Sequence, residues 1–211
     1  MPTSGLAGLF VSSLVTFFVV IDPPGCAPIY AGLTAGVDRA HVRAMALRAV
    51  GVAAAILFVF ALFGQDILSA LGISLDSFRI AGGIMLFLIA LEMVFEKRTQ
   101  RREDRAQKLM DTPEHEDVSI FPMAMPMIAG PGSIASVMLL MSRGHGIEHT
   151  LVILAAMAAI LALTLIALLL AGPLMRIMGQ KIEAVITRLL GVLLAALAAQ
   201  FVIDGIRASL I

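Results

Sequence analysis

Six apolar segments, each long enough to cross a bilayer, occupy most of this 211-residue chain and constrain its fold more than any other feature. They run from 6 to 34, 43 to 65, 76 to 96, 118 to 141, 150 to 171 and 184 to 208. A helix needs about 20 apolar residues to cross the hydrocarbon core, and only helices or closed barrels satisfy their backbone groups there. We therefore predict an all-α membrane protein with six transmembrane helices in contact with membrane lipid.

The composition agrees with a membrane location and argues against several other classes of protein. Apolar residues make up 60% of the chain and charged residues 14%, which leaves too little polar surface to coat a soluble domain. The net charge is zero and no basic block carries interleaved aromatic residues, so we expect no nucleic-acid partner. A single cysteine and four histidines without ligand spacing predict neither a metal site nor a bound cofactor.

Two Pro-Gly interruptions lie inside the first and fourth apolar segments, at 22–26 (DPPGC) and 129–133 (AGPGS). Proline has no N–H, so it removes a helical hydrogen bond and breaks or bends the helix. We therefore predict that helices 1 and 4 are broken near the membrane midplane. Irregular backbone survives at that depth only where it is buried in protein or lines a polar cavity, which points to a transported solute.

The two interruptions superimpose when the chain is shifted by 107 residues, which pairs Pro24 with Pro131, Gly25 with Gly132 and Cys26 with Ser133. This predicts two repeats of three helices, at 1–96 and 118–211, joined by a connecting loop at 97–117. Because each repeat has an odd number of helices, the second enters the membrane from the opposite face, giving inverted repeats.

Most Lys and Arg residues flank the connections that follow helices 1, 3 and 5. Basic residues near the ends of spans are retained on the cytoplasmic side. The loop at 97–117 is therefore expected in the cytoplasm, and both termini on the outer side.

The chemistry of the breaks follows from the backbone groups that they release. The N–H groups of 25–27 and 132–134 are expected to have no carbonyl four residues back, and they lie at the positive ends of two half-helices. Because the repeats are inverted, these ends are expected to converge near the midplane, where an anionic group would fit between them.

Asp22 is the one acid predicted deep inside a span, and an intramembrane acid is a functional candidate by default. When ionised it could hold Na⁺ or a substrate ammonium, and with a raised pKa it could carry H⁺ across the membrane. The alternative reading is a cap on the following half-helix. Glu92, Gln200 and Asp204 are weaker candidates. Snorkelling toward water is the favoured reading of Glu92, and an interhelical hydrogen bond and an interfacial acid explain Gln200 and Asp204 as well as a vestibule does. The small-residue pairs Gly51 with Ala55 and Gly82 with Gly83 are interpreted as close helix-packing faces.

Three motifs in this order make the chain resemble the MarC family. They are Ile-Asp-Pro-Pro-Gly at 21–25 with Pro28, Ala-Gly-Pro-Gly-Ser at 129–133 after Pro122 and Pro126, and Gln-Phe-Val-Ile-Asp-Gly at 200–205. The resemblance runs from helix 1 to helix 6 and implies a six-span protein of the bacterial inner membrane. The termini that the basic residues place on the outer side would then be periplasmic. It also implies transport of small neutral amino acids such as glycine and alanine. Many members place Asn where this chain has Cys26.

These observations lead to the hypothesis of a secondary transporter that works by alternating access and is coupled to H⁺ or Na⁺. A small zwitterion needs donors for its carboxylate and acceptors for its ammonium, and the two breaks would supply both. The predicted substrate site consists of Asp22, Pro24, Gly25, Cys26, Gly130, Pro131, Gly132 and Ser133, with Asp22 also coupling the ion. The alternatives are a passive channel, a small-solute exporter and a non-transporting membrane protein. The sequence leaves undecided whether the chain forms a homo-oligomer. No intramembrane nucleophile and base have catalytic spacing, so we do not expect an enzyme.

Overall fold

The computed structural model describes residues 5–95, 117–142 and 146–210, with backbone alone at 175–183, and within these residues the regular secondary structure is helical, joined by short turns. In chain order the helices are α1 (Leu6–Ile21), α2 (Pro23–Leu33), α3 (Arg39–Ala70), α4 (Leu75–Val94), η1 (Ser119–Ile128), α6 (Pro131–Met141), α7 (Ile147–Leu169) and α8 (Ala171–Ser209). The predicted loop at 97–117 falls, except for Asp117, outside the described residues.

The six predicted spans correspond to helices of the structure. Five segments are long and apolar enough to cross a membrane: Leu6–Leu33, Arg39–Ala70, Leu75–Val94, Ile147–Leu169 and Ala184–Ser209. The sixth is η1 followed by α6, which bend by 49° at their junction. The prediction of an all-α membrane protein is therefore confirmed, with boundaries that differ by a few residues for most spans.

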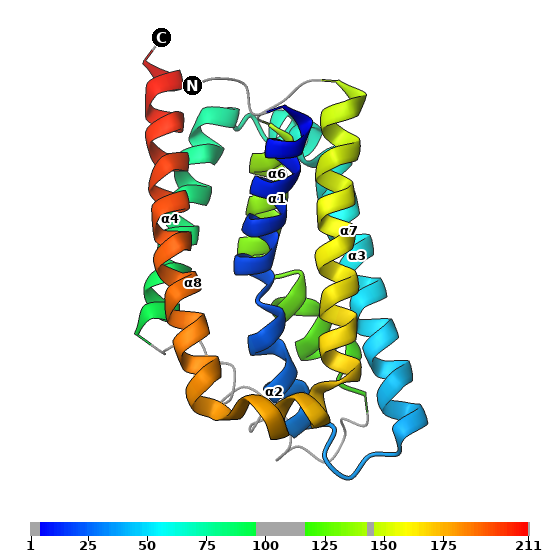
Figure 1. Cartoon of the computed structure of the whole chain (residues 1–211). Helices are drawn as coiled ribbons and strands as arrows, with labels where there is room; N and C mark the ends of the chain where they lie inside the picture. The colour runs from blue at the N-terminus through cyan, green and yellow to red at the C-terminus, as the bar shows by residue number, and fades with distance from the viewer. Residues whose placement is uncertain (1–4, 96–116, 143–145, 211) are drawn as a thin grey trace.

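The sixth predicted span differs most from the structure, because α8 begins at Ala171 and not near 184. Its first part runs across the end of the bundle before the helix turns into the long span (Figure 1). Hydropathy marks the part of a helix that lies in the membrane, and a helix can continue beyond that part.

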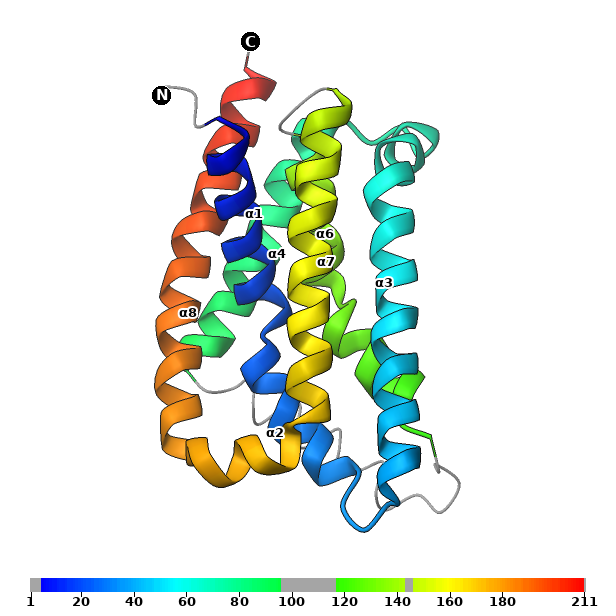
Figure 2. The ribbon, with the colours of Figure 1, turned by 45° about the vertical axis from the view of Figure 1, so that its right-hand side comes forward.

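The helices form three layers, which Figures 1 and 2 show from two directions. α4 and α8 lie together on one side, α3 and α7 lie on the other, and the two broken spans, α1–α2 and η1–α6, fill the middle. The first residues of α1 and the last of α8 lie at the same end of the bundle (Figure 1); this end is called the terminal end below. The middle layer places both breaks in the protein interior.

Glycines bring α4 and α8 into close contact. Each of two glycines lies against a backbone carbonyl and a valine of the other helix: Gly83 against Ala198 and Val202, and Gly191 against Ala90 and Val94. A Cβ atom would lie 2.9 Å from the carbonyl oxygen at Gly83 and 3.1 Å from it at Gly191. The two contacts are reciprocal. A shift of 108 residues relates Gly83 to Gly191, Ala90 to Ala198 and Val94 to Val202. The interpretation of Gly83 as a packing residue is therefore confirmed.

The other predicted packing pair is wrong within the described protein. No atom lies within 4 Å of the place where a Cβ of Gly51 would be, and Ala55 is exposed. Small apolar residues face lipid as readily as they face another helix, because both surroundings are apolar.

Candidate functional site

The first break is made by one residue, Asp22, which ends α1 and begins α2. Its backbone has φ 61° and ψ 64°, the left-handed conformation that terminates helices. Its N–H still donates to the Phe18 carbonyl at 3.0 Å, which completes the last turn of α1. Pro23 and Pro24 then occupy the first turn of α2, where a missing N–H costs least.

The carboxylate of Asp22 caps α2. It is only 2% exposed, and its Oδ1 accepts the N–H of Gly25 at 3.1 Å. A Cβ at Gly25 would lie 2.3 Å from Oδ2, so the absence of a side chain there makes room for the carboxylate. Of the two readings of Asp22, the structure thus confirms the cap and leaves an additional role in transport as a prediction.

The prediction that the N–H groups of Gly25 and Cys26 are open to a ligand is wrong in this conformation. The Gly25 N–H is bound by Asp22 Oδ1, and the Cys26 N–H donates to the Asp22 carbonyl at 3.0 Å. The predicted start of the helix is two residues too late, since Asp22 itself supplies both acceptors. The positive end of α2 therefore already holds a carboxylate that belongs to the protein.

The second break lies between η1 and α6 and has no such cap. The Ala129 N–H donates to the Ala124 carbonyl at 2.9 Å, and α6 then begins at Pro131 after Gly130. The Ile134 N–H donates to Gly130 at 3.0 Å, so its predicted availability is also wrong. No side chain caps the start of α6. Among the six predicted donors, those of Gly132 and Ser133 are thus the best placed to meet an anionic guest.

Prolines explain the irregular backbone of η1. Phe121 (φ −124°, ψ 125°) and Met125 (φ −133°, ψ 124°) leave the helical region, and each directly precedes a proline, which disfavours helical backbone in the residue before it. The Met123 N–H donates to Val118 at 3.3 Å, one residue further back than in an α-helix. The fourth span is therefore irregular over its whole first half as well as at the break.

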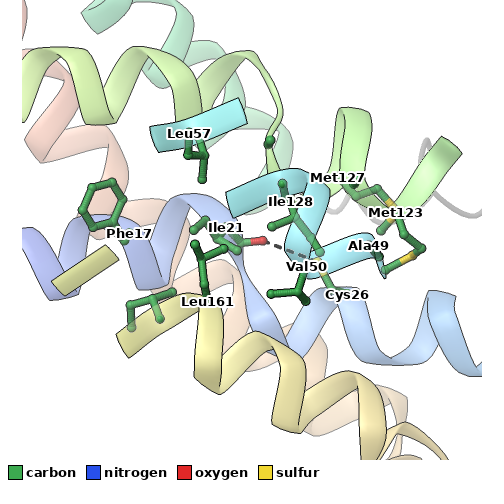
Figure 3. Close-up of a cluster of buried hydrophobic side chains, with 14 of the residues drawn as sticks. Phe17, Ile21, Cys26, Ala49, Val50, Leu57, Met123, Met127, Ile128 and Leu161 are labelled. Atoms are coloured by element: carbon green, nitrogen blue, oxygen red, sulfur yellow. Dashed lines mark hydrogen bonds between the residues drawn. The ribbon is translucent and has the colours of Figure 1, made fainter. Parts of the chain in front are cut away.

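The same hydrogen bond crosses both breaks. The Cys26 thiol donates to the Ile21 carbonyl at 3.5 Å, drawn as a dashed line in Figure 3, and the Ser133 hydroxyl donates to the Ile128 carbonyl at 2.7 Å. Donor and acceptor are five residues apart in each case, and the two pairs are related by the 107-residue shift. Cys26 therefore makes at the first break the same hydrogen bond that Ser133 makes at the second.

The two breaks meet inside the bundle. A Cβ at Gly132 would lie 3.3 Å from Cγ1 of Val20, which places the start of α6 against the end of α1. Ile21, Cys26 and Ile128 belong to one buried apolar cluster (Figure 3). The start of α6 thus lies against the first break, and the two breaks share buried apolar surroundings in this conformation.

Six of the eight predicted site residues are buried at this junction: Asp22, Gly25, Cys26, Gly130, Gly132 and Ser133. Pro24 is half-buried and Pro131 is exposed. Both prolines lie in the first turns of their helices, α2 and α6. The candidate site thus consists of one buried carboxylate, one uncapped helix start and apolar walls.

The three weaker candidates lie on the α4–α8 layer. Gln200 donates to Asp204 Oδ1 at 2.6 Å along the exposed side of α8. Glu92 is half-buried in the last turn of α4, one turn beyond Ile89, whose Cδ1 would be 2.6 Å from a Cβ at Gly132. None of the three belongs to a broken span.

Buried hydroxyl groups were missed by the sequence reasoning. Ser13 on α1 and Ser136 on α6 are completely buried, and neither hydroxyl has a hydrogen-bond partner among the described residues. A buried unsatisfied hydroxyl costs about 1–3 kcal/mol. Serine inside an apolar helix was the available signal, although most such serines bond to their own backbone. Both lie on the halves of the broken spans nearer the terminal end.

Charged residues tie segments together at the two ends of the bundle. At the terminal end, Arg79 donates to Asp76 at 3.0 Å and to the Ser142 carbonyl at the end of α6 at 3.1 Å. At the other end, Asp117 pairs with Arg48. Burial opposes ionisation of Asp117, but hydrogen bonds from Ser119 and the charges of Arg48 and His41 outweigh it and lower the pKa of Asp117. No group of three metal-ligating side chains occurs within the described residues.

Comparison with known proteins identifies relatives over almost the whole chain. The model of the MarC family, described as MarC family integral membrane proteins, matches residues 7–210. A UPF0056 membrane protein of Methanocaldococcus jannaschii is 35% identical over 96% of this chain and 98% of its own length. The UPF0056 membrane protein YhcE of Escherichia coli is 33% identical over 94% of this chain and 92% of its own length. YvbG of Bacillus subtilis is 32% identical over 93% of each chain. No solved structure matches.

Proposed function

The chain belongs to the MarC family of integral membrane proteins, and from that premise we propose that it is a secondary transporter of small neutral amino acids. The observation that carries the proposal is the meeting of two interrupted spans, one capped by a buried carboxylate and the other uncapped. Discontinuous helices that meet inside a membrane protein are the usual place for substrate and coupling ions in secondary transporters.

The difference between the two breaks suggests how a zwitterion would bind. Its carboxylate would accept hydrogen bonds from the N–H groups of Gly132 and Ser133 at the positive end of α6. Its ammonium would face Asp22, whose carboxylate already lies at the other break. Because Asp22 caps α2 and no side chain caps α6, the start of α6 alone is the better site for the substrate carboxylate.

The packing at the break favours a compact substrate. A Cβ at Gly132 would lie 2.6 Å from Ile89 and 3.3 Å from Val20, and one at Gly130 would lie 2.3 Å from the Pro126 carbonyl oxygen. Little space separates α6 from its neighbours here. Glycine or alanine therefore fits the proposal better than an amino acid with a long side chain.

Alternating access would open this buried junction to each side in turn. The reciprocal Gly83 and Gly191 contacts and the matching hydrogen bonds of Cys26 and Ser133 support two repeats related by a pseudo-two-fold axis. Such repeats can exchange roles between an outward-open and an inward-open state. Asp22 would bind or release H⁺ or Na⁺ as its exposure changes. The distribution of basic residues supports periplasmic termini and a location in the bacterial inner membrane.

Uptake into proteoliposomes tests the proposal. Labelled glycine, alanine and serine are supplied with pH and Na⁺ gradients imposed separately. The proposal predicts accumulation against a concentration gradient that depends on one of the two ions. Flux that only equalises concentrations would indicate a channel, and no flux of any of the three would leave the amino-acid proposal unsupported.

The Asp22→Asn variant tests the role of the carboxylate. An amide oxygen can still accept the Gly25 N–H, so α2 keeps a cap, but the charge that the ammonium and the ion require is gone. We expect ion-driven uptake to be lost while the protein remains folded. Asp66→Asn, at an exposed position in α3, is the matched control and should transport normally. Undiminished ion-driven uptake by Asp22→Asn would remove Asp22 from the mechanism.

A further inference from the structure

An apolar groove between α3 and α7 opens on the outer surface of the bundle. It has a volume of about 440 Å³ and is lined by Ala54, Ala55, Phe58, Leu154, Met157, Ala158 and Leu161. Ligand sites in proteins typically enclose about 300–1,000 Å³. Met157 and Leu161 are almost fully buried and form its floor, whereas Phe58 is 47% exposed on its rim.

An open track along α3 leads from this groove toward the end of the bundle opposite the terminal end. Leu47, Gly51, Ala55 and Phe58 are exposed and spaced by three or four residues, so they share one face of the helix. Nothing lies within 4 Å of a Cβ position at Gly51. The track is therefore both apolar and unobstructed along its length.

Two arginines flank the start of the track. Arg43 and Arg48 are exposed on the adjoining faces of α3, and Arg48 also pairs with Asp117. At 1.5 Å per residue, Arg48 and Arg43 lie about 10 Å and about 18 Å along the helix from Ala55. One leaflet of hydrocarbon is about 15 Å thick. The arginines are thus at headgroup depth when the groove is at the depth of the acyl chains.

From this arrangement we propose that the groove holds an acyl chain of an anionic phospholipid whose phosphate is bound by Arg43 and Arg48. The lipid belongs to the leaflet at the arginine end, the predicted cytoplasmic one. Arg43 supplies most of the attraction, because Asp117 partly neutralises Arg48. A helix of a second copy would cover the same groove, but it would also press against the arginines without supplying an anion. This inference does not depend on the proposed transport function.

The test uses the absence of tryptophan from the chain. Phe58→Trp places a single fluorophore at the rim of the groove. The protein is reconstituted in phosphatidylcholine vesicles that contain a small fraction of either brominated phosphatidylglycerol or brominated phosphatidylcholine, which quench tryptophan on contact. Brominated phosphatidylglycerol should quench more strongly at equal mole fraction. Leu193→Trp, at an exposed position on α8, is the control and should show no preference between the two lipids.

Arg43 variants in the Phe58→Trp background identify the source of the preference. One arginine near the membrane surface changes the affinity for an anionic lipid about fivefold, so Arg43→Gln should lower the preference by about that factor. Arg43→Lys should retain it, and Arg207→Gln, at the terminal end, should leave it unchanged. Equal quenching by both lipids, or a preference that survives Arg43→Gln, would overturn the proposal. Absence of quenching by either lipid would show that a protein segment covers the groove and would overturn it as well.

Discussion

The substitution Gly25→Ala tests the geometry of the first break most sharply. The added Cβ would lie 2.3 Å from Asp22 Oδ2, 2.8 Å from Cγ and 2.9 Å from Oδ1. The helix backbone at Gly25 is held by Pro23 and Pro24, so the carboxylate is the group that must move. We therefore expect the variant to fold with Asp22 turned away from the start of α2.

The magnitude follows from the hydrogen bond that is lost. Removing a helix N-cap lowers the free energy of unfolding by about 0.5–2 kcal/mol. Because the buried carboxylate also loses its hydrogen-bond donor, we expect a combined loss of about 1–3 kcal/mol. For a chain of this size each kcal/mol lowers the melting temperature by roughly 2–4 °C. Thermal unfolding in detergent should thus show a decrease of several degrees, and ion-driven uptake should fall with it.

Gly51→Ala is the matched control, because no atom lies near its Cβ position and the helix gains propensity. It should be as stable as the parent protein or slightly more stable. If Gly25→Ala unfolds at the same temperature as Gly51→Ala, the Asp22 carboxylate does not lie against the start of α2, and the description of the first break is wrong.

Four further substitutions test the packing and charges elsewhere. Gly83→Ala and Gly191→Ala should each lower the free energy of unfolding by about 1–3 kcal/mol, because the added Cβ meets a backbone carbonyl that cannot move aside; an unchanged denaturation midpoint would contradict this. Arg79→Gln should cost about 1 kcal/mol by removing a cation from the end of α6, measured by the same unfolding. The pKa of Asp117 is lowered, so its ionised carboxylate stabilises the folded protein. This stabilisation is complete above the pKa of about 4 that the group has in the unfolded chain, and it is lost as the pH falls below that value. Asp117→Asn should remove that part of the pH dependence in melting experiments between pH 3 and 6.

The breaks could be predicted from the sequence because their cause is covalent. Pro23, Pro24 and Pro131 have no N–H in any environment, so the loss of helical hydrogen bonds at these positions does not depend on the fold. The irregular backbone before Pro122 and Pro126 has the same origin. Both breaks were therefore located to within a few residues.

The sequence could not show which backbone N–H groups lack an acceptor at each break, because this depends on where the side chain of Asp22 lies. Asp22 occupies a left-handed backbone conformation that brings its carboxylate to Gly25 and its carbonyl to Cys26. The sequence contained both readings of Asp22 but not this dihedral angle. The uncapped start of α6 became evident only by comparison with the capped start of α2.

The lipid-facing surface was the other feature beyond reach of the sequence. In a soluble protein a buried face differs from an exposed one in polarity, whereas in a membrane both are apolar. Gly83 and Gly51 therefore look alike in sequence, although one packs against α8 and the other lies in the open.

Accessibility of Cys26 to thiol reagents tests the central claim most directly. Cys26 is the only cysteine, lies at the first break and is completely buried in this structure. If the junction opens to each side in turn, a small membrane-impermeant thiol reagent should modify Cys26 from either side of the membrane, and glycine or alanine should slow the reaction. A Ser133→Cys variant that also carries Cys26→Ser should behave in the same way. A thiol that reacts from neither side, or from one side at a rate that substrate does not change, would contradict the account.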